Sequence, residues 1–101
     1  MKKVTIVLPR DYNNGKLIPA SVINDCLYKI RKLSGGYTKF DAIGTYEKNE
    51  EIYHDRNIVI MTVVHDLVVD VLRILTSDFC KILEQECIYF EVSDCDVDFV
   101  C

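Results

Sequence analysis

The segment that most constrains the fold of this chain is residues 58–64, which would be apolar on both faces of a β-strand. Its side chains alternate between two sets, with Ile58, Ile60, Thr62 and Val64 on one face and Val59, Met61 and Val63 on the other. A strand that is apolar on both faces belongs in the middle of a sheet. The sequence therefore predicts a sheet with a neighbouring strand on each side of this segment.

Periodicity elsewhere predicts the other elements of that sheet and the helices that cover it. Strands are expected at 4–8, 37–46, 52–64 and from about residue 87, and helices over about 19–33 and 67–84. A polar turn over 47–51 joins the two middle strands, and Asp66 is the expected N-cap of the second helix. The order β-α-β-β-α-β predicts an α+β ferredoxin-like sandwich: a four-stranded antiparallel sheet with two helices on one face.

Two boundaries stay open at this level. Val68 and Val69 are poor helix formers, so the strand that ends the hairpin could continue to about Val69 instead of giving way to a helix. The alternating residues Val97, Phe99 and Cys101 either extend the last strand or form an extra edge strand. The first helix is better defined, because Pro19 suits a first turn and Gly35-Gly36 suits a C-terminal cap.

Length and charge restrict the possible partners. The 101 residues predict a single domain over 1–101, and a net charge of −4 argues against broad binding to nucleic acid or to an anionic membrane. The charge is uneven: residues 1–35 hold seven basic and two acidic side chains, a net of +5, whereas residues 82–101 hold six acidic ones, a net of −6. Either these are two solvated faces, or the ends pair between subunits or with a basic partner.

Cysteine and histidine usage predicts a cytoplasmic protein without a metal or another cofactor. The five cysteines are an odd number, no signal peptide precedes them, and neither CxxC nor HxxxH spacing occurs. No apolar run approaches the 18 or so residues of a membrane span.

Candidate binding residues gather at three places along the chain. The loop after the first strand offers Arg10, Tyr12 and Asn13, and the connection before the last strand offers Gln85 and Glu86, which could instead cap the second helix. In the hairpin, Tyr46 suits an interface, and His54 begins the polar stretch His54-Asp55-Arg56-Asn57. In a strand, His54 and Arg56 would lie on one face and Asp55 and Asn57 on the other.

Several short motifs carry a resemblance to known proteins. Gly35-Gly36-Tyr37-Thr38, then Ala42-x-Gly44-x-Tyr46, then Gln85-Glu86 before the last strand, resemble small, largely uncharacterised ferredoxin-like proteins of bacteria, phages and other mobile elements. The pattern is also loosely similar to the PII-like group. The resemblance covers residues 1–92 and implies the same fold, oligomerisation through the sheet, and a role in binding a ligand or a protein.

These observations predict a small, non-enzymatic binding or regulatory protein that forms a homodimer through the uncovered face of its sheet. The expected role is that of a phage or mobile-element accessory protein, for example in counter-defence, which binds a host protein or a small polar, nucleotide-like ligand. Several of the apolar residues Val7, Ile43, Val59, Met61 and Val63 are expected on the uncovered face. The alternative is a small-metabolite enzyme of the dimeric ferredoxin-like type, acting through His54, Asp55 or Glu86.

Overall fold

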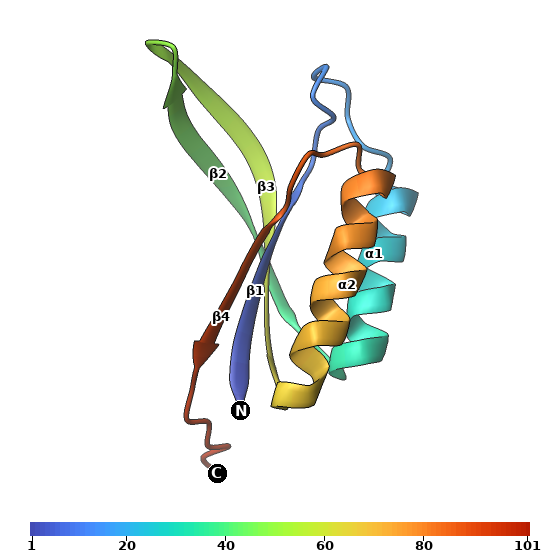
Figure 1. Cartoon of the computed structure of the whole chain (residues 1–101), viewed down its shortest axis with the longest axis vertical. Coiled ribbons are helices and arrows are strands. Elements are labelled where there is room, and N and C mark those ends of the chain that lie inside the picture. The colour runs from blue at the N-terminus through green and yellow to red at the C-terminus, as the bar shows by residue number, and fades with distance from the viewer.

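The computed structural model describes all residues from 1 to 101 and has two layers, a sheet and a pair of helices (Figure 1). The elements in chain order are β1 (Lys2–Pro9), α1 (Ala20–Ser34), β2 (Thr38–Lys48), β3 (Glu51–Val64), α2 (Asp66–Ile82) and β4 (Tyr89–Asp94). The strands lie in the order β2-β3-β1-β4, and every neighbouring pair is antiparallel. Both helices cover the same face of the sheet. The predicted ferredoxin-like fold is confirmed.

The core lies between the helices and one face of the two central strands. β1 and β3 contribute alternate residues to it, and each helix contributes one apolar stripe. The largest fully buried side chains include Phe79, Ile6, Leu8, Ile30, Ile60 and Leu72. The prediction that residues 58–64 lie inside the sheet is confirmed, because β3 pairs with β1 on one side and with β2 on the other.

The helix boundaries differ from prediction by one or two residues at each end. Pro19 is the N-cap of α1 and not its first residue, while Gly35 takes the left-handed conformation at the C-cap, with φ of 86°. Asp66 is the first residue of α2, and His65 is the N-cap in its place. The alternative that extended the strand to Val69 is wrong, because Val69 is buried on the inner face of α2. Tertiary burial outweighs the weak helix propensity of valine here.

The hairpin of β2 and β3 is longer and its turn tighter than predicted. Only Asn49 and Glu50 lie outside the strands, with φ of 53° and 67°, so the polar residues around them belong to the ladder. Two residues with positive φ are the signature of a type I′ hairpin turn. β1 pairs with β3 only as far as Asn57, so residues 51–56 pair with β2 alone. This outer part of the hairpin, residues 43–56, projects beyond the rest of the sheet and is called the arm below (Figure 1).

The C-terminal residues follow neither of the two alternatives left open by the sequence. β4 starts at Tyr89, two residues later than expected, and residues 95–101 form no strand. Cys95 donates its backbone N–H to the Met1 carbonyl at 3.4 Å. Beyond it, the side chains of Phe99 and Val100 are 93% and 92% exposed.

The second face of the sheet carries no helix. The register places alternate residues of all four strands on it: Thr5 and Val7, Val59, Met61 and Val63, Phe40 and Tyr46, and Tyr89. This set is called the open face below. Of the five apolar residues considered for this face, Ile43 is not on it: Ile43 lies opposite Arg56, which shares the helix-side face with Ile58, and projects from the arm with 74% exposure.

The molecule is elongated for its size. Its dimensions are 45 × 28 × 25 Å and its radius of gyration is 14.5 Å, against about 12.7 Å for a compact domain of this length. Its accessible surface is 7087 Å², about 1,200 Å² more than the roughly 5,900 Å² expected from the mass. Neither helix combines the length and apolarity that a membrane-spanning helix requires.

Candidate functional site

A cleft of about 550 Å³ opens where β1 ends and the arm continues without it. Three parts of the chain form its walls: the arm, the loop between β1 and α1, and the connection between α2 and β4. The lining residues are Val7, Pro9, Asp11, Tyr12, Asn13, Gly15, Tyr46, Tyr53, His54, Asp55, Arg56, Asn57, Gln85, Cys87 and Ile88. The volume lies within the range of about 300–1,000 Å³ that is usual for small-molecule sites.

Two stacked tyrosines form the aromatic part of the cleft. Tyr46 and Tyr53 lie opposite each other in the β2–β3 register, with ring centroids 5.3 Å apart and planes inclined by 18°. The Tyr53 hydroxyl donates a 2.8 Å hydrogen bond to the Glu51 carboxylate, and this bond raises the pKa of Tyr53. The bond fixes one ring, and the ring of Tyr46 stacks on it.

Opposite charges stand next to each other on β3. Strand alternation sends Asp55 to the open face and Arg56 to the other face, as predicted, and both line the cleft because the arm forms its edge. Asp55 takes part in none of the ion pairs of the structure. The cleft therefore presents a free carboxylate and a guanidinium from adjacent residues.

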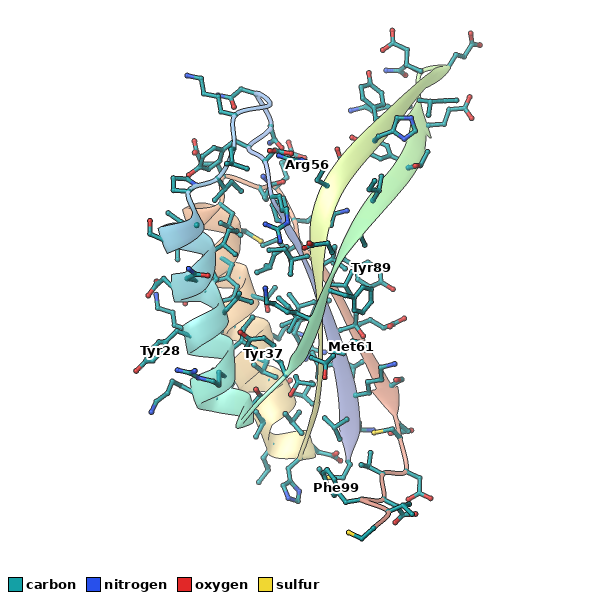
Figure 2. The ribbon with its side chains drawn as sticks, turned by 180° about the vertical axis from the view of Figure 1, so that it is seen from behind. Tyr28, Tyr37, Arg56, Met61, Tyr89 and Phe99 are labelled. Atoms are coloured by element: carbon teal, nitrogen blue, oxygen red, sulfur yellow. The ribbon has the colours of Figure 1, made fainter.

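Arg56 ties the arm to the loop that follows β1 (Figure 2). Its Nε donates to Oδ2 of Asp11 at 2.9 Å, and its Nη2 donates to Oδ1 at 2.5 Å. The hydrogen bond from Arg56 is the main cause that lowers the pKa of Asp11, and the same contact raises the pKa of Arg56. Because the pair is bidentate, it fixes the plane of the guanidinium as well as its position.

The remaining walls are held by shorter-range contacts. The Asn13 side-chain amide donates to the Glu84 carbonyl at 3.3 Å, which links the loop after β1 to the end of α2. Gln85 donates through Nε2 to the Leu83 carbonyl at 2.9 Å, so it takes the capping role and lines the cleft as well. His54 Nδ1 lies 3.0 Å from the Thr45 hydroxyl on the neighbouring strand.

Asn57 and Gly44 lie close together at the base of the arm. A Cβ on Gly44 would lie 3.0 Å from Nδ2 of Asn57, which is closer than real Cβ atoms normally approach. The missing side chain of Gly44 therefore leaves room for the Asn57 amide at the cleft wall.

The structure brings together five of the seven predicted site residues. Those that line the cleft are Tyr12, Asn13, Tyr46, His54 and Gln85. Arg10 and Glu86 do not line it. Arg10 pairs with Asp41 of β2 and lines a smaller pocket of about 130 Å³, while Glu86 is exposed beyond the cleft wall.

The main residues missing from the predicted set are Asp11, Tyr53, Asp55, Arg56 and Asn57. Asp11, Tyr53 and Asp55 each stand directly beside a chosen residue, and Arg56 and Asn57 follow His54 by two and three positions. The sequence signal therefore located the right stretches but not the right members of them. Whether Arg10 or Asp11 reaches the cleft depends on long-range pairing, which brings Asp11 to Arg56 and Arg10 to Asp41. No cluster of three or more His, Cys, Asp or Glu side chains is placed to hold a metal ion.

Comparison with known proteins gives similarity in structure but not in sequence. No protein-family model matches the chain. No curated protein matches it either. Among solved structures, a phage SAM lyase in complex with S-methyl-5′-thioadenosine is similar, with a TM-score of 0.70 and 12% identity over 92% of this chain and 80% of that one.

Two proteins of the CutA group have the same arrangement. A point mutant of CutA1 from Pyrococcus horikoshii OT3 gives a TM-score of 0.68 with 12% identity over 97% of this chain and 87% of that one. The PII-like protein CutA from Nostoc sp. PCC 7120 gives 0.65 with 14% identity over 95% and 82%. At these identities the similarity establishes the fold, and it agrees with the expected likeness to PII-like proteins and to phage proteins.

The first of these structures contradicts the prediction that the chain is not an enzyme. That prediction rested on the absence of known catalytic patterns from a ferredoxin-like chain of this kind. A lyase has the same architecture over 92% of the chain, so the fold gives no ground for excluding catalysis.

Proposed function

We propose that this protein binds S-adenosylmethionine in the cleft between the arm and the loop after β1, and cleaves it as a lyase. The observation that carries the proposal is the composition of the cleft, where an aromatic pair and two opposite charges converge from three separate parts of the chain. The structural similarity to a phage SAM lyase selects this ligand from the small polar, nucleotide-like molecules that the sequence predicts.

Each part of the ligand has a matching group in the cleft. The adenine ring offers a flat apolar face for Tyr46 or Tyr53, and aromatic stacking is worth about 1–3 kcal/mol per base. Asn13, Asn57 and Gln85 offer amide donors and acceptors for the ring and ribose edges. The sulfonium is a cation, and the unpaired carboxylate of Asp55 is the group that would stabilise it.

The reaction requires little from the protein other than binding the substrate in the reacting conformation. The carboxylate of the ligand's own amino-acid group attacks the carbon bonded to sulfur and closes a five-membered lactone as the carbon–sulfur bond breaks. Sulfur keeps the electron pair of that bond and becomes the neutral thioether of S-methyl-5′-thioadenosine. A positively charged sulfur is already a good leaving group, so the cleft accelerates the step by holding the reacting conformation and excluding water. Asp55 and the tyrosines are the residues assigned to these tasks.

The proposal includes assembly of the chain through its open face. Phe40, Tyr46 and Tyr89 are 47%, 48% and 58% exposed there, and the surface in excess of a compact monomer is of the order that a protein–protein interface buries. Copies of the same chain are the expected partners, with a dimer as the predicted state. A host protein is also predicted as a partner from the sequence. No surface of the molecule is assigned to such a partner in this proposal.

The test is direct incubation of the purified protein with S-adenosylmethionine, followed by chromatography. The expected result is formation of S-methyl-5′-thioadenosine in proportion to protein concentration. Asp55→Asn and Tyr53→Ala should each lower the rate at least tenfold, because each removes one ligand contact without touching the core. Asp70→Asn and Tyr28→Ala are the matched controls on the helices, and should leave the rate unchanged.

Two results would overturn the proposal in different ways. If the protein binds S-methyl-5′-thioadenosine but forms no product, the ligand class stands and the lyase activity is wrong. If neither compound binds at millimolar concentration, the assignment of the cleft is wrong.

A further inference from the structure

The guanidinium of Arg56 has one edge occupied and one edge free. An arginine side chain carries five N–H donors, arranged on a side edge of Nε and Nη2 and an end edge of Nη1 and Nη2. Asp11 takes the side edge through Nε and Nη2. No protein acceptor is hydrogen-bonded to Nη1, and the Arg56 side chain in its ion pair is 58% exposed. Three N–H donors therefore remain available in the cleft.

Asp11 is a fixed anchor for that arrangement. It forms a β-bridge with Leu17, and the backbone N–H of Tyr12 donates to the Lys16 carbonyl at 2.8 Å, so the loop is closed on itself. The backbone N–H of Arg10 donates to the Arg56 carbonyl at 3.0 Å, which joins loop and arm at the same residue. The Asp11 side chain is only 25% exposed. Loop, ion pair and arm thus hold the guanidinium in one orientation.

The free end edge matches a carboxylate better than any other part of the proposed ligand. A carboxylate accepts two parallel N–H···O bonds from a guanidinium edge, and such charge-assisted pairs are about twice as strong as neutral hydrogen bonds. S-adenosylmethionine carries one carboxylate, on its amino-acid group. In S-methyl-5′-thioadenosine that group has been lost, so Arg56 would distinguish substrate from product.

We infer that Arg56 is a specificity-determining residue that binds the carboxylate of an amino-acid-bearing adenosyl ligand, with Asp11 as its positioning residue. This inference rests on the proposed function. It adds the means by which the cleft holds the amino-acid end of the substrate and releases the shortened product.

The experiment compares two stable thioethers that share the adenosyl group. S-adenosylhomocysteine carries the amino-acid carboxylate and S-methyl-5′-thioadenosine does not, and neither has a sulfonium. Calorimetric titration of the wild-type protein should give a Kd for S-adenosylhomocysteine about tenfold or more below that for S-methyl-5′-thioadenosine, in line with a hydrogen-bonded charge pair.

The variants separate recognition from folding. Arg56→Lys keeps the charge but lacks the second edge, so it should remove most of the difference between the two ligands while leaving the Kd for S-methyl-5′-thioadenosine within about twofold. Asp11→Asn should reduce the difference in part, because the guanidinium loses its charged anchor. Arg73→Lys is the matched control, since Arg73 pairs with Asp70 on α2, outside the cleft. It should change neither Kd.

Each outcome decides the inference. A general structural loss would weaken both ligands equally, so an unchanged ratio of the two Kd values in Arg56→Lys and Asp11→Asn overturns the assignment. If the wild-type protein binds both ligands equally well, the inference is wrong and the proposed function stands. If it binds neither, both are wrong.

Discussion

Phe79 and Phe99 show that the contribution of a phenylalanine to the stability of this chain depends on where it lies in the fold. Phe79 is fully buried between α2 and the sheet, whereas Phe99 is 93% exposed beyond β4. Truncation of a buried phenylalanine removes its transfer free energy and leaves a cavity. Phe79→Ala should therefore lower the free energy of unfolding by about 3–5 kcal/mol.

The measurement is urea denaturation followed by circular dichroism, with Phe99→Ala as the matched control. The control should lie within about 0.5 kcal/mol of wild type, as surface substitutions usually do. Equal losses in the two variants would show that residues 95–101 pack on the body of the protein in solution.

Three carboxylates make the stability of the folded chain depend on pH in the acidic range. Hydrogen bonds from Arg56, Arg10 and Lys2 lower the pKa values of Asp11, Asp41 and Asp94 respectively. A carboxylate with a lowered pKa in the folded state stabilises the fold above its unfolded-state pKa of about 3.9, and this contribution is lost as the pH falls through the lowered value. The contribution is thus present at pH 7 and disappears progressively below about pH 4.

Thermal melts of wild type and an Asp11→Asn, Asp41→Asn, Asp94→Asn variant would test this dependence. The difference in Tm should be present at pH 7 and shrink as the pH is lowered below 4. It should also shrink at high salt, because all three pairs are exposed and screened. A difference that persists at pH 2 would mean that the substitutions act through packing and not through charge.

At the scale of the elements, the end of α1 depends on the conformation of a single glycine. Gly35 caps the helix with φ of 86° and donates its N–H to the Arg31 carbonyl at 2.8 Å. A side chain in this conformation costs about 1–2 kcal/mol. Gly35→Ala should lower the free energy of unfolding by about 1 kcal/mol.

Gly36→Ala is the control for this substitution in denaturant melts. Gly36 does not have positive φ, and a Cβ there would meet nothing within 4 Å. Its replacement should cost less than half as much. An equal loss in both variants would show that chain flexibility, and not the left-handed cap, is what α1 requires.

The tight turn of the arm contains a glutamate, Glu50, at a position where the backbone conformation favours glycine. Glu50 has φ of 67° at the second turn position, where glycine is preferred. Glu50→Gly should slow amide hydrogen exchange in residues 43–56 by roughly two- to fivefold, because it relieves left-handed strain. Glu47→Gly, inside β2, should instead speed that exchange, since glycine weakens a strand interior. Faster exchange in both variants would contradict the assignment of the turn.

The sequence predicts the elements more completely than it predicts the site. Alternation in residues 58–64 and the apolar stripes of both helices suffice for the order, the sheet and the core. The turn at Asn49-Glu50 lies within the predicted turn over 47–51, but its length was overestimated because the flanking polar residues resemble a loop, although the ladder continues through them. In the site, the sequence marks residues 10–13, 54–57 and 85 but not which members converge. That choice depends on long-range pairing, which brings Asp11 to Arg56 and Arg10 to Asp41.

At the scale of the whole molecule, elongation and the open face predict that the chain works as a subunit. The helices cover one face of the sheet only, and Val59, Met61 and Val63 lie half-buried in the middle of the other. Met61→Lys places a charge on that face and should convert an oligomer into a monomer.

Sedimentation equilibrium at micromolar concentration is the measurement. The wild-type protein should have a mass that is a multiple of the 11.7 kDa of one chain, and Met61→Lys should have the mass of a single chain. Ile74→Lys is the matched control, because Ile74 lies on α2 with 66% exposure. It should sediment like wild type. A wild-type chain that sediments as a monomer would overturn assembly through the open face.

Because of the arm, the residues that stabilise the fold and the residues that line this wall of the cleft are different sets. One wall of the cleft stands on a two-stranded ribbon that contributes no side chain to the buried core, while Phe79 and its neighbours lie elsewhere. Substitutions in the arm can therefore alter the shape and chemistry of the cleft at little expense to the fold, and substitutions in the core can be accepted without changing what the cleft recognises. Descendants of such a chain could diverge in ligand while remaining superimposable in backbone.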